Sequence, residues 1–261
     1  YSHIASTQFL KNGTPVFYET FDEVFDAVER GEAEFGVLPI ANSTTGSIVQ
    51  TYGLMREHDF KICAETKVKV DHCLAVKPGV KLEEVKSIYS HEQGIMQCQE
   101  FIKKHGFKTH KYANTSLAAC FIKGSEKPLG AICSQVCAKE LGLEILETDI
   151  VDASENYTKF MLISKKTMCL ENANIVSVSL AVPHTSSALY RLLTKFSVAG
   201  LNLCMIESSP VANTDFDVIF YLDFEGRITT PDVAKLILSS QVKKIIKNLS
   251  VEKHITLTIT D

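Results

Sequence analysis

The chain has 261 residues, of which 45% are hydrophobic, and a formal net charge of −4. This length suggests about two domains with substantial cores, and the acidic balance without a basic stripe excludes a typical nucleic-acid partner. No apolar run approaches the roughly 20 residues that cross a bilayer and no signal peptide is visible, so we expect no membrane partner.

The eight cysteines predict neither a metal site nor disulfide bonds. The sequence contains no C-x-x-C pair, and most of its cysteines lie among apolar residues. Free buried thiols are typical of a reducing compartment, so we predict a cytoplasmic protein. The sequence also lacks a P-loop and a G-x-G-x-x-G segment, and we predict no cofactor.

The first two-thirds of the chain alternate short apolar runs with amphipathic stretches, which predicts an α/β fold. Residues 20–30 are expected to form a helix, because Phe21, Val24, Phe25 and Val28 recur at helical spacing and Gly31 follows. A helix capped by Ser2 is expected before it. A buried strand at 35–40, the polar loop 41–46 and a helix at 47–57 come next.

The remaining elements continue this alternation as far as a polar stretch at 165–174, where we place a domain boundary. Strands are predicted at 60–64, 68–76, 87–89, 108–112, 130–133 and 158–163, and helices at 92–104, 116–123 and 134–141. After the boundary we predict strands at 174–182, 201–208, 216–224 and 251–260, with helices at 186–199 and 231–239. This βαββαβ order is ferredoxin-like, and Gly200 and Pro231 suit a helix end and a helix start.

Several predicted helices begin directly after polar loops that follow strands. Ser90 and Gln93 match a capping box, Thr115 and Ser116 are suited to cap the next helix, and residues 42–46 suit a turn. One interpretation is that these side chains only initiate helices. The other is that they and the helix N–H groups also face one cleft, where they would bind a small anionic ligand.

Residues 156–160 place a hydroxyl beside an ammonium at the start of an apolar run. Alternation predicts Thr158 and Phe160 on one strand face and Lys159 on the other. Lys159 is the only basic residue in these loops, and an exposed strand lysine is the alternative. His3 and His91 pair with no acid or nucleophile by spacing, so we expect structural histidines.

The C-terminal segment offers a second candidate site. By topology, the strand exit at residues 206–210 faces the loop 184–187, which opens a helix. Helix N–H groups there would bind the carboxylate of an amino acid, and Glu207 or a carbonyl its ammonium. A simple strand-to-turn exit is the alternative.

Five segments, in order along essentially the whole chain, resemble motifs of the prephenate dehydratase family with a C-terminal ACT regulatory domain. Each motif alone is weak, but five in order with a matching tail are specific. They are residues 1–5 (YSHIA, the end of G-x-x-G-T-[FY]-S-x-x-A, whose start we expect to be missing), 36–43 (GVLPIANS, G-V-x-P-I-E-N-S), 90–98 (SHEQGIMQC, S-H-x-Q-A-x-x-Q-C), 114–119 (NTSLAA, S-T-x-x-A-A) and 156–160 (NYTKF, N-x-T-R-F).

The chain departs from these patterns at positions that matter. Lys159 replaces an arginine, Ala41 a glutamate and Gly94 an alanine. Because lysine is a point charge without the arginine fork, substrate affinity or rate could fall. In the tail, residues 207–210 (ESSP) depart from E-S-R-P and residues 187–189 (SAL) from G-A-L, so the motifs predict catalysis more strongly than feedback by phenylalanine.

The resemblance implies a two-lobed, periplasmic-binding-protein-like dehydratase domain at 1–165 and an ACT domain at 174–261. Lobe one would comprise about 1–75 with 152–165, lobe two about 76–151, with the active site between them and crossings near Ala75 and Asp152. It implies no metal, and a homodimer or homotetramer. The implied catalytic residue is Thr158, the substrate-binding residues are Asn42, Ser43, Ser90, Gln93, Thr115, Ser116, Lys159 and Phe160, and the effector-binding residues are Ser187, Ala188, Leu189, Asn202, Glu207 and Ser208.

The implied reaction converts prephenate to phenylpyruvate, water and carbon dioxide, with phenylalanine as a possible effector. Two alternatives stay open: a small-molecule sensor on the same scaffold that no longer turns its ligand over, and arogenate as the substrate. In some relatives a chorismate mutase domain precedes the dehydratase, and the sequence leaves open whether one precedes Tyr1.

Overall fold

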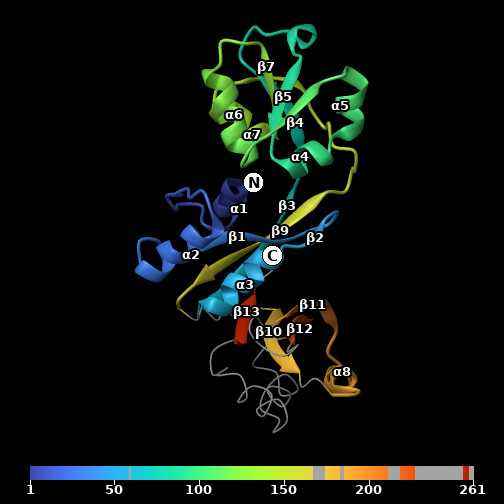
Figure 1. Cartoon of the computed structure of the whole chain (residues 1–261). Helices are drawn as coiled ribbons and strands as arrows, with labels where there is room; N and C mark the ends of the chain where they lie inside the picture. Colours follow the sequence, from blue (N-terminus) through green and yellow to red (C-terminus); the bar gives the residue numbers. More distant parts are fainter. Residues whose placement is uncertain (59, 167–173, 183–184, 211–217, 227–254, 259–261) are drawn as a thin grey trace. The chain divides into compact units, whose positions relative to one another are not determined.

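The computed structural model describes residues 1–58, 60–166, 174–182, 185–210, 218–226 and 255–258 (Figure 1). The chain divides into two compact units. Unit 1 comprises Val68–Thr158 with Tyr1, and unit 2 comprises Ser2–Lys67 with Lys159–Asp261. The chain therefore changes unit at Lys67/Val68 and at Thr158/Lys159, and not near Ala75 and Asp152 as predicted.

Unit 1 is built on a sheet with the order β6-β5-β7-β4-β8. Strand β5 runs parallel to β6 and β7, whereas β4 runs antiparallel to β7 and β8. The strands are β4 (His72–Val76), β5 (Ser87–Ser90), β6 (Lys108–Lys111), β7 (Leu129–Ser134) and β8 (Glu144–Glu147), and the helices are η1 (Leu82–Glu84), α4 (Glu92–Met96), α5 (Gln99–His105), α6 (Thr115–Gly124) and α7 (Gln135–Glu140).

Both faces of this sheet are buried. Successive residues of β4 and β7 alternate between two hydrophobic clusters, with Leu74 and Ile132 in one and Cys73 and Cys133 in the other. Helices α4 and α5 cover the first face, and α6 and α7 cover the second (Figure 1). Near-continuous apolar runs such as β4 follow from this two-sided burial.

Unit 2 contains a sheet with the order β2-β1-β9-β3. Its strands are β1 (Gly36–Asn42), β2 (Gly46–Ser47), β3 (Lys61–Lys69) and β9 (Tyr157–Ser164), and its first helices are α1 (Ser2–Phe9), α2 (Phe21–Arg30) and α3 (Val49–Glu57). Helix α2 begins one residue later than predicted, because Thr20 is its N-cap and forms a capping box with Glu23, and Gly31 ends the helix at φ +73° as predicted.

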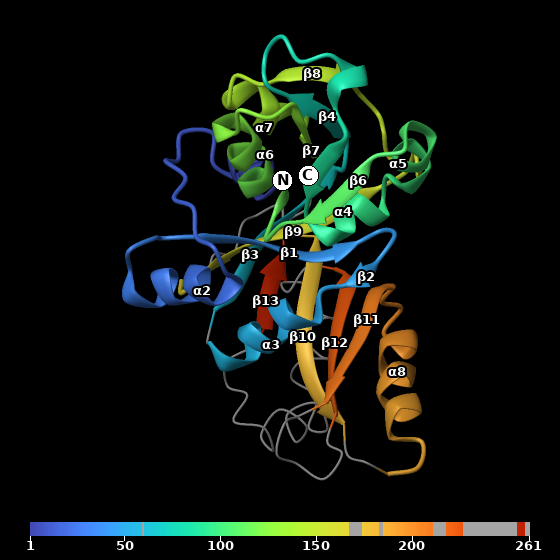
Figure 2. The same cartoon turned by 45° about the horizontal axis from the view of Figure 1, so that its top comes forward.

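Unit 2 also contains an antiparallel sheet with the order β11-β12-β10-β13. The elements are β10 (Ile175–Val182), α8 (Ala188–Val198), β11 (Leu203–Pro210), β12 (Val218–Glu225) and β13 (Ile255–Thr258). Strand β12 lies between β10 and β11, which α8 connects, and this is the predicted split βαβ arrangement. Helix α8 packs on this sheet through Leu192 and Phe196 (Figure 2). The predicted helix at 231–239, with Pro231, lies outside the described residues.

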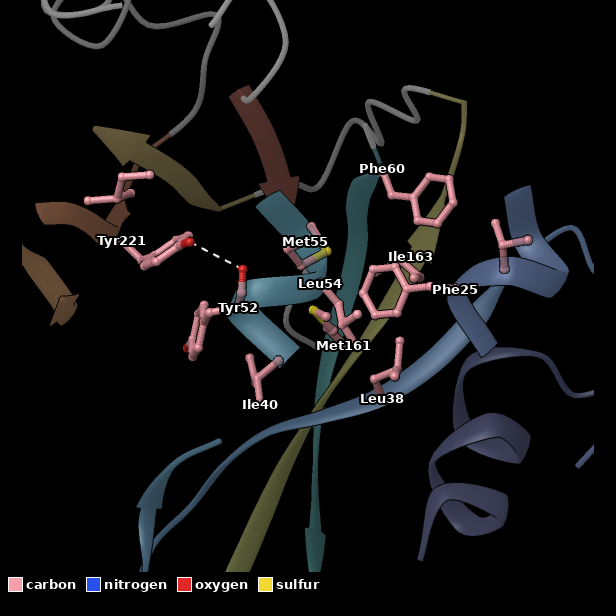
Figure 3. Packing of buried hydrophobic residues seen from close by; sticks show 12 residues of the cluster. Phe25, Leu38, Ile40, Tyr52, Leu54, Met55, Phe60, Met161, Ile163 and Tyr221 are labelled. Carbon is pink, nitrogen blue, oxygen red and sulfur yellow. Dashed lines mark hydrogen bonds between the residues drawn. The ribbon is translucent and has the colours of Figure 1, made fainter. Parts of the chain in front are cut away.

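One hydrophobic core joins the two sheets of unit 2 (Figure 3). It contains Phe25 of α2, Leu38 of β1, Tyr52 of α3, Met161 of β9 and Tyr221 of β12. The hydroxyl of Tyr221 donates to the backbone carbonyl of Tyr52 at 3.1 Å, and the hydroxyl of Tyr52 lies 3.1 Å from the sulfur of Met205. The C-terminal sheet is therefore packed against the elements that precede it in sequence.

Several boundaries differ from the predictions for identifiable reasons. Residues 41–46 do not lead into a helix: Ala41 and Asn42 pair with Ser47 and Gly46 in a hairpin, and α3 begins only at Val49. The predicted helix 92–104 is interrupted at Gln97–Cys98. The structure has β3 at Lys61–Lys69 and β4 at His72–Val76 where strands were predicted at 60–64 and 68–76. Strand β8 was not predicted. Of the predicted boundary at 165–174, residues 167–173 lie outside the described part.

Matched glycine substitutions test this packing. A Cβ at Gly36 would lie 2.9 Å from Cγ1 of Ile163 and 3.0 Å from Cγ1 of Val24, so Gly36→Ala should cost about 1–3 kcal/mol of unfolding free energy. A Cβ at Gly53 in α3 meets nothing within 4 Å, so Gly53→Ala should stabilise by up to about 1 kcal/mol. Urea unfolding measures both, and equal effects would contradict the packing described.

Candidate functional site

In unit 1, two predicted ligand-binding residues converge on Gly94. A Cβ added there would lie 2.7 Å from Oγ of Ser90, 3.5 Å from Nε2 of His72 and 3.6 Å from Cγ2 of Thr115. These side chains come from the end of β5, the start of β4 and the start of α6. The structure therefore brings together residues from motifs that lie more than twenty positions apart.

Ser90 does not cap α4 as predicted. It is fully buried, and its hydroxyl donates to the carbonyl of Ile132 at 2.8 Å. The N-cap is His91, whose Nδ1 accepts from the backbone N–H of Gln93 at 3.2 Å, while the Gln93 side chain is exposed. The prediction of a structural role for His91 is consistent with this cap.

Helix α6 likewise has a different cap from the one predicted. The side chain of Asn114 accepts from the backbone N–H of Leu117 at 2.7 Å, so Thr115 and Ser116 are the first helical residues. Thr115 is half-buried and Ser116 is exposed. Because capping occupies neither hydroxyl, both remain candidates for ligand contacts.

His72 is a candidate residue that sequence analysis missed. It is 3% exposed, its Nδ1 lies 3.0 Å from the hydroxyl of Tyr1, and its ring is hydrogen-bonded to the side chain of Gln97. Burial lowers the pKa of His72 to about 4, so the ring is neutral at pH 7. The sequence did contain an indication of this burial, because His72 begins the apolar run 72–76 and a histidine in such a run is expected to be buried.

In unit 2, Asn42 lies at the β1–β2 hairpin and is 8% exposed. Its Oδ1 accepts from the backbone N–H groups of Thr44 and Thr45, at 3.0 and 3.1 Å, and from the hydroxyl of Thr44 at 2.6 Å. This is an Asx-type turn, and it leaves Ser43 exposed at the tip. The loop is therefore a turn held by the Asn42 side chain, as one of the two interpretations predicts.

Strand β9 carries Thr158 and Lys159 at the point where the chain passes from unit 1 to unit 2. Thr158 is half-buried, and Phe160 is 2% exposed. The ammonium of Lys159 lies 3.1 Å from Oε2 of Glu65 on the neighbouring strand β3. Lys159 is therefore not an exposed strand lysine, because its charge is paired with a buried carboxylate.

Glu65 is the second residue that sequence analysis missed. Its side chain is 2% exposed. Burial, and to a smaller extent the charge of Asp223, raise the pKa of Glu65 to about 7 against the opposing effect of Lys159. A signal existed in the alternation of β3, since Cys63 and Glu65 occupy inward positions of one strand.

The predicted effector residues lie on α8 and β11. Ser187 caps α8 with φ +61°, Ala188 is buried, and Leu189 packs against the core of this sheet. Glu207 and Ser208 lie within β11 and not at its exit, and the carboxylate of Glu207 accepts a hydrogen bond from the hydroxyl of Ser47. The carbonyl of Asn202 accepts from the N–H of Glu225 at 2.9 Å. His184 of the predicted loop lies outside the described residues.

Two further findings concern ligands and membranes. In the part of the chain that the structure describes, no group of three or more His, Cys, Asp or Glu side chains is arranged to hold a metal ion. Within the same residues, no helix has the length and apolar character needed to span a membrane. The cysteines described there are all free thiols.

The environment of His72 makes a spectroscopic prediction. Because desolvation lowers the pKa of this ring, its NMR signals should keep the chemical shifts of a neutral imidazole down to about pH 4. A His72→Asn variant assigns the signals. Titration of the assigned ring at pH 6 or above would contradict the buried position described for it.

Comparison with known proteins places these observations in a family. The sequence profile described as prephenate dehydratase matches residues 1–168. Arogenate dehydratase 2 of Petunia hybrida is 33% identical over 243 residues, which cover 87% of this chain and 62% of that protein. The bifunctional chorismate mutase/prephenate dehydratase of Aquifex aeolicus is 31% identical over 231 residues, covering 87% and 63%. The chain thus spans somewhat under two-thirds of these relatives.

Two solved structures match over nearly the whole chain. GqqA, described as a novel type of quorum quenching acylase, has a TM-score of 0.87 and 26% identity, covering 100% of this chain and 94% of that one. The prephenate dehydratase of Arthrobacter aurescens in complex with L-Phe has a TM-score of 0.83 and 24% identity, covering 96% and 83%, and supports the two-lobed fold. With the profile covering most of the described residues, the chain belongs to the prephenate dehydratase family.

Proposed function

We propose that this protein catalyses the decarboxylating dehydration of prephenate to phenylpyruvate. The observation that carries the proposal is the convergence of Ser90 and Thr115, from two separate family motifs, on the same point beside Gly94. Residues of two family motifs, together with the neutral imidazole of His72, therefore meet at one point of unit 1, as the two motifs of a common substrate site would.

The reaction requires only a few functional groups from the protein. Loss of carbon dioxide and the ring hydroxyl makes the ring aromatic, so the enzyme needs to assist departure of the hydroxyl while the ring carboxylate stays free to leave. Binding that carboxylate too strongly would stabilise the substrate without lowering the barrier. Neutral hydrogen-bond donors suit this requirement better than a cluster of cations.

Thr158 is the proposed proton or hydrogen-bond donor to the leaving hydroxyl. An unperturbed threonine is a weak acid, so strong hydrogen-bond donation or a relay is more plausible than full ionisation. The residues proposed to orient the carboxylates are Asn42, Ser43, Ser90, Gln93, Thr115 and Ser116, with Phe160 supporting the strand. Lys159 is the proposed anchor, and its ion pair with Glu65 means that it brings little uncompensated positive charge.

Three other functions follow from specific observations. Relatives named arogenate dehydratase support arogenate as a substrate, which carries an amino group in place of the keto group of prephenate. The substitutions at Lys159 and Ala41 support a sensor that binds without turnover. The neighbour described as an acylase makes hydrolysis of an acylated amine a third candidate function. One assay series with prephenate, arogenate and an acylated amine distinguishes these functions.

Substitution of Thr158 tests the catalytic assignment. Thr158→Ala should lower kcat by roughly 10²–10⁴-fold, because a positioned donor contributes about this factor. Thr158→Ser keeps the hydroxyl and is the matched control, so it should retain most activity. Phenylpyruvate formation at neutral pH is the measurement, with circular dichroism to verify folding.

The outcomes separate the candidates. Near-normal phenylpyruvate formation by Thr158→Ala would refute the role of this threonine while leaving the activity in place. Wild-type protein that binds prephenate without turnover would favour the sensor. Formation of phenylalanine from arogenate, with no turnover of prephenate, would favour the arogenate dehydratase.

We also propose phenylalanine as an effector bound by Ser187, Ala188, Leu189, Asn202, Glu207 and Ser208. Calorimetry should detect binding at or below millimolar phenylalanine. Glu207→Gln should weaken it by roughly 10–100-fold, because a hydrogen bond to a charged group contributes about 1.5–3 kcal/mol. No heat at millimolar phenylalanine would end this proposal without affecting the catalytic one.

A further inference from the structure

Glu65 is a buried charged group that the proposed mechanism does not use. In the part of the chain that the structure describes, its oxygen Oε2 is paired with the ammonium of Lys159 at 3.1 Å. The other oxygen, Oε1, is buried and has no hydrogen-bond partner within the described residues. A half-satisfied carboxylate in a hydrophobic interior costs stability. A neutral or apolar residue would cost less at this position, so its presence calls for an explanation.

A second buried carboxylate lies close to the first. Asp223 of β12 is 3% exposed and faces its cross-strand partner Ser177, whose side chain is hydrogen-bonded to it. Its charge acts on both Glu65 and Lys159, and burial raises the pKa of Asp223 above its ordinary range. Among the described residues only Glu65 forms an ion pair with Lys159, and Asp223, from the other sheet, acts on this pair at longer range. We call these three residues the charged cluster.

The cluster sits in a packed interior and not at a loose contact. The hydrogen bond from Tyr221 to Tyr52 and the aromatic contact between them, with ring centroids 4.9 Å apart, hold β12 against α3 (Figure 3). The hydroxyl of Ser47, in the hairpin that carries Asn42, also bonds Glu207 of β11. A small shift of the C-terminal sheet would therefore change the distances between the residues of the cluster.

We propose that Glu65 is a positioning residue for the dehydration: its ion pair with Lys159 fixes the position of the adjacent Thr158, and the buried Asp223 tunes that pair. This inference rests on the proposed function, since it assigns a catalytic consequence to the placement of Thr158.

A small movement of Thr158 has a large effect on the rate. Lys159 follows Thr158 directly in β9, so loss of the ion pair with Glu65 frees the residue next to the threonine to move. A misplacement of about 1 Å can cost roughly 100-fold in rate. When Glu65 is ionised its charge holds the ammonium of Lys159, and when Glu65 is protonated that attraction is lost.

The ionisation of Glu65 makes the rate depend on pH. The pKa of Glu65 is raised to about 7, so kcat should rise as the pH increases through that value. Other titratable groups also face the cluster and contribute to its field. They are Lys67 of β3, Tyr52 of α3, Tyr221 of β12, and Cys204 and Glu207 of β11.

Two substitutions with a matched control test the proposal on the full chain. Glu65→Gln should lower kcat at pH 8 by roughly 10–100-fold with little change in KM, and should remove the rise near pH 7. Asp223→Asn removes a charge that raises the pKa of Glu65, so the rise should move to lower pH. Glu225→Gln, an exposed carboxylate on the same strand, should leave the profile unchanged.

The Asp223→Asn variant decides the question even if Glu65→Gln does not fold. A shift to lower pH in this variant, with no shift in Glu225→Gln, supports the proposal, because a purely structural role would not move a kinetic pH profile. Turnover with a wild-type profile in Asp223→Asn overturns it and leaves the proposed function intact. A wild-type protein with no dehydratase turnover at any pH overturns both.

Discussion

The hydrophobic core shared by the two sheets of unit 2 is the interaction on which the rest of the structure depends. Phe25, Leu38 and Tyr52 pack there with Met161 of β9 and Tyr221 of β12. By removing water around β3 and β9, this interior raises the pKa of Glu65 and strengthens the electrostatic attraction between Glu65 and Lys159. The polar chemistry proposed for β9 is therefore a consequence of apolar packing around it.

The elements that follow from local patterns were predictable. Helix α2, the buried strand β1 and the split βαβ order of the C-terminal sheet all follow from periodicity and helix-stop residues, which act over a few positions. The β1–β2 hairpin was missed because its pairing depends on Ser47 returning to Ala41, and the break between α4 and α5 carries no proline or glycine signal.

The candidate site, like the fold, was only partly predictable from the sequence. Motif residues such as Ser90, Thr115 and Thr158 were identified from the sequence, but their partners were not. Glu65 and His72 acquire significance only through residues far along the chain, Lys159 and Tyr1 respectively. Lysine in place of the family arginine also gains a physical meaning. A point charge needs only the single oxygen, Oε2, through which Glu65 pairs with Lys159, whereas the planar fork of arginine favours a bidentate partner.

Gly94 illustrates how such substitutions depend on their surroundings. The family pattern has alanine there, yet a methyl group at this position would press against the Ser90 hydroxyl and disturb its bond to the Ile132 carbonyl. Reverting this single residue to the family consensus should therefore be harmful unless neighbouring residues change with it. In evolutionary terms the position is epistatic, and ancestral or consensus engineering of this protein has to exchange the neighbours of Gly94 as a set.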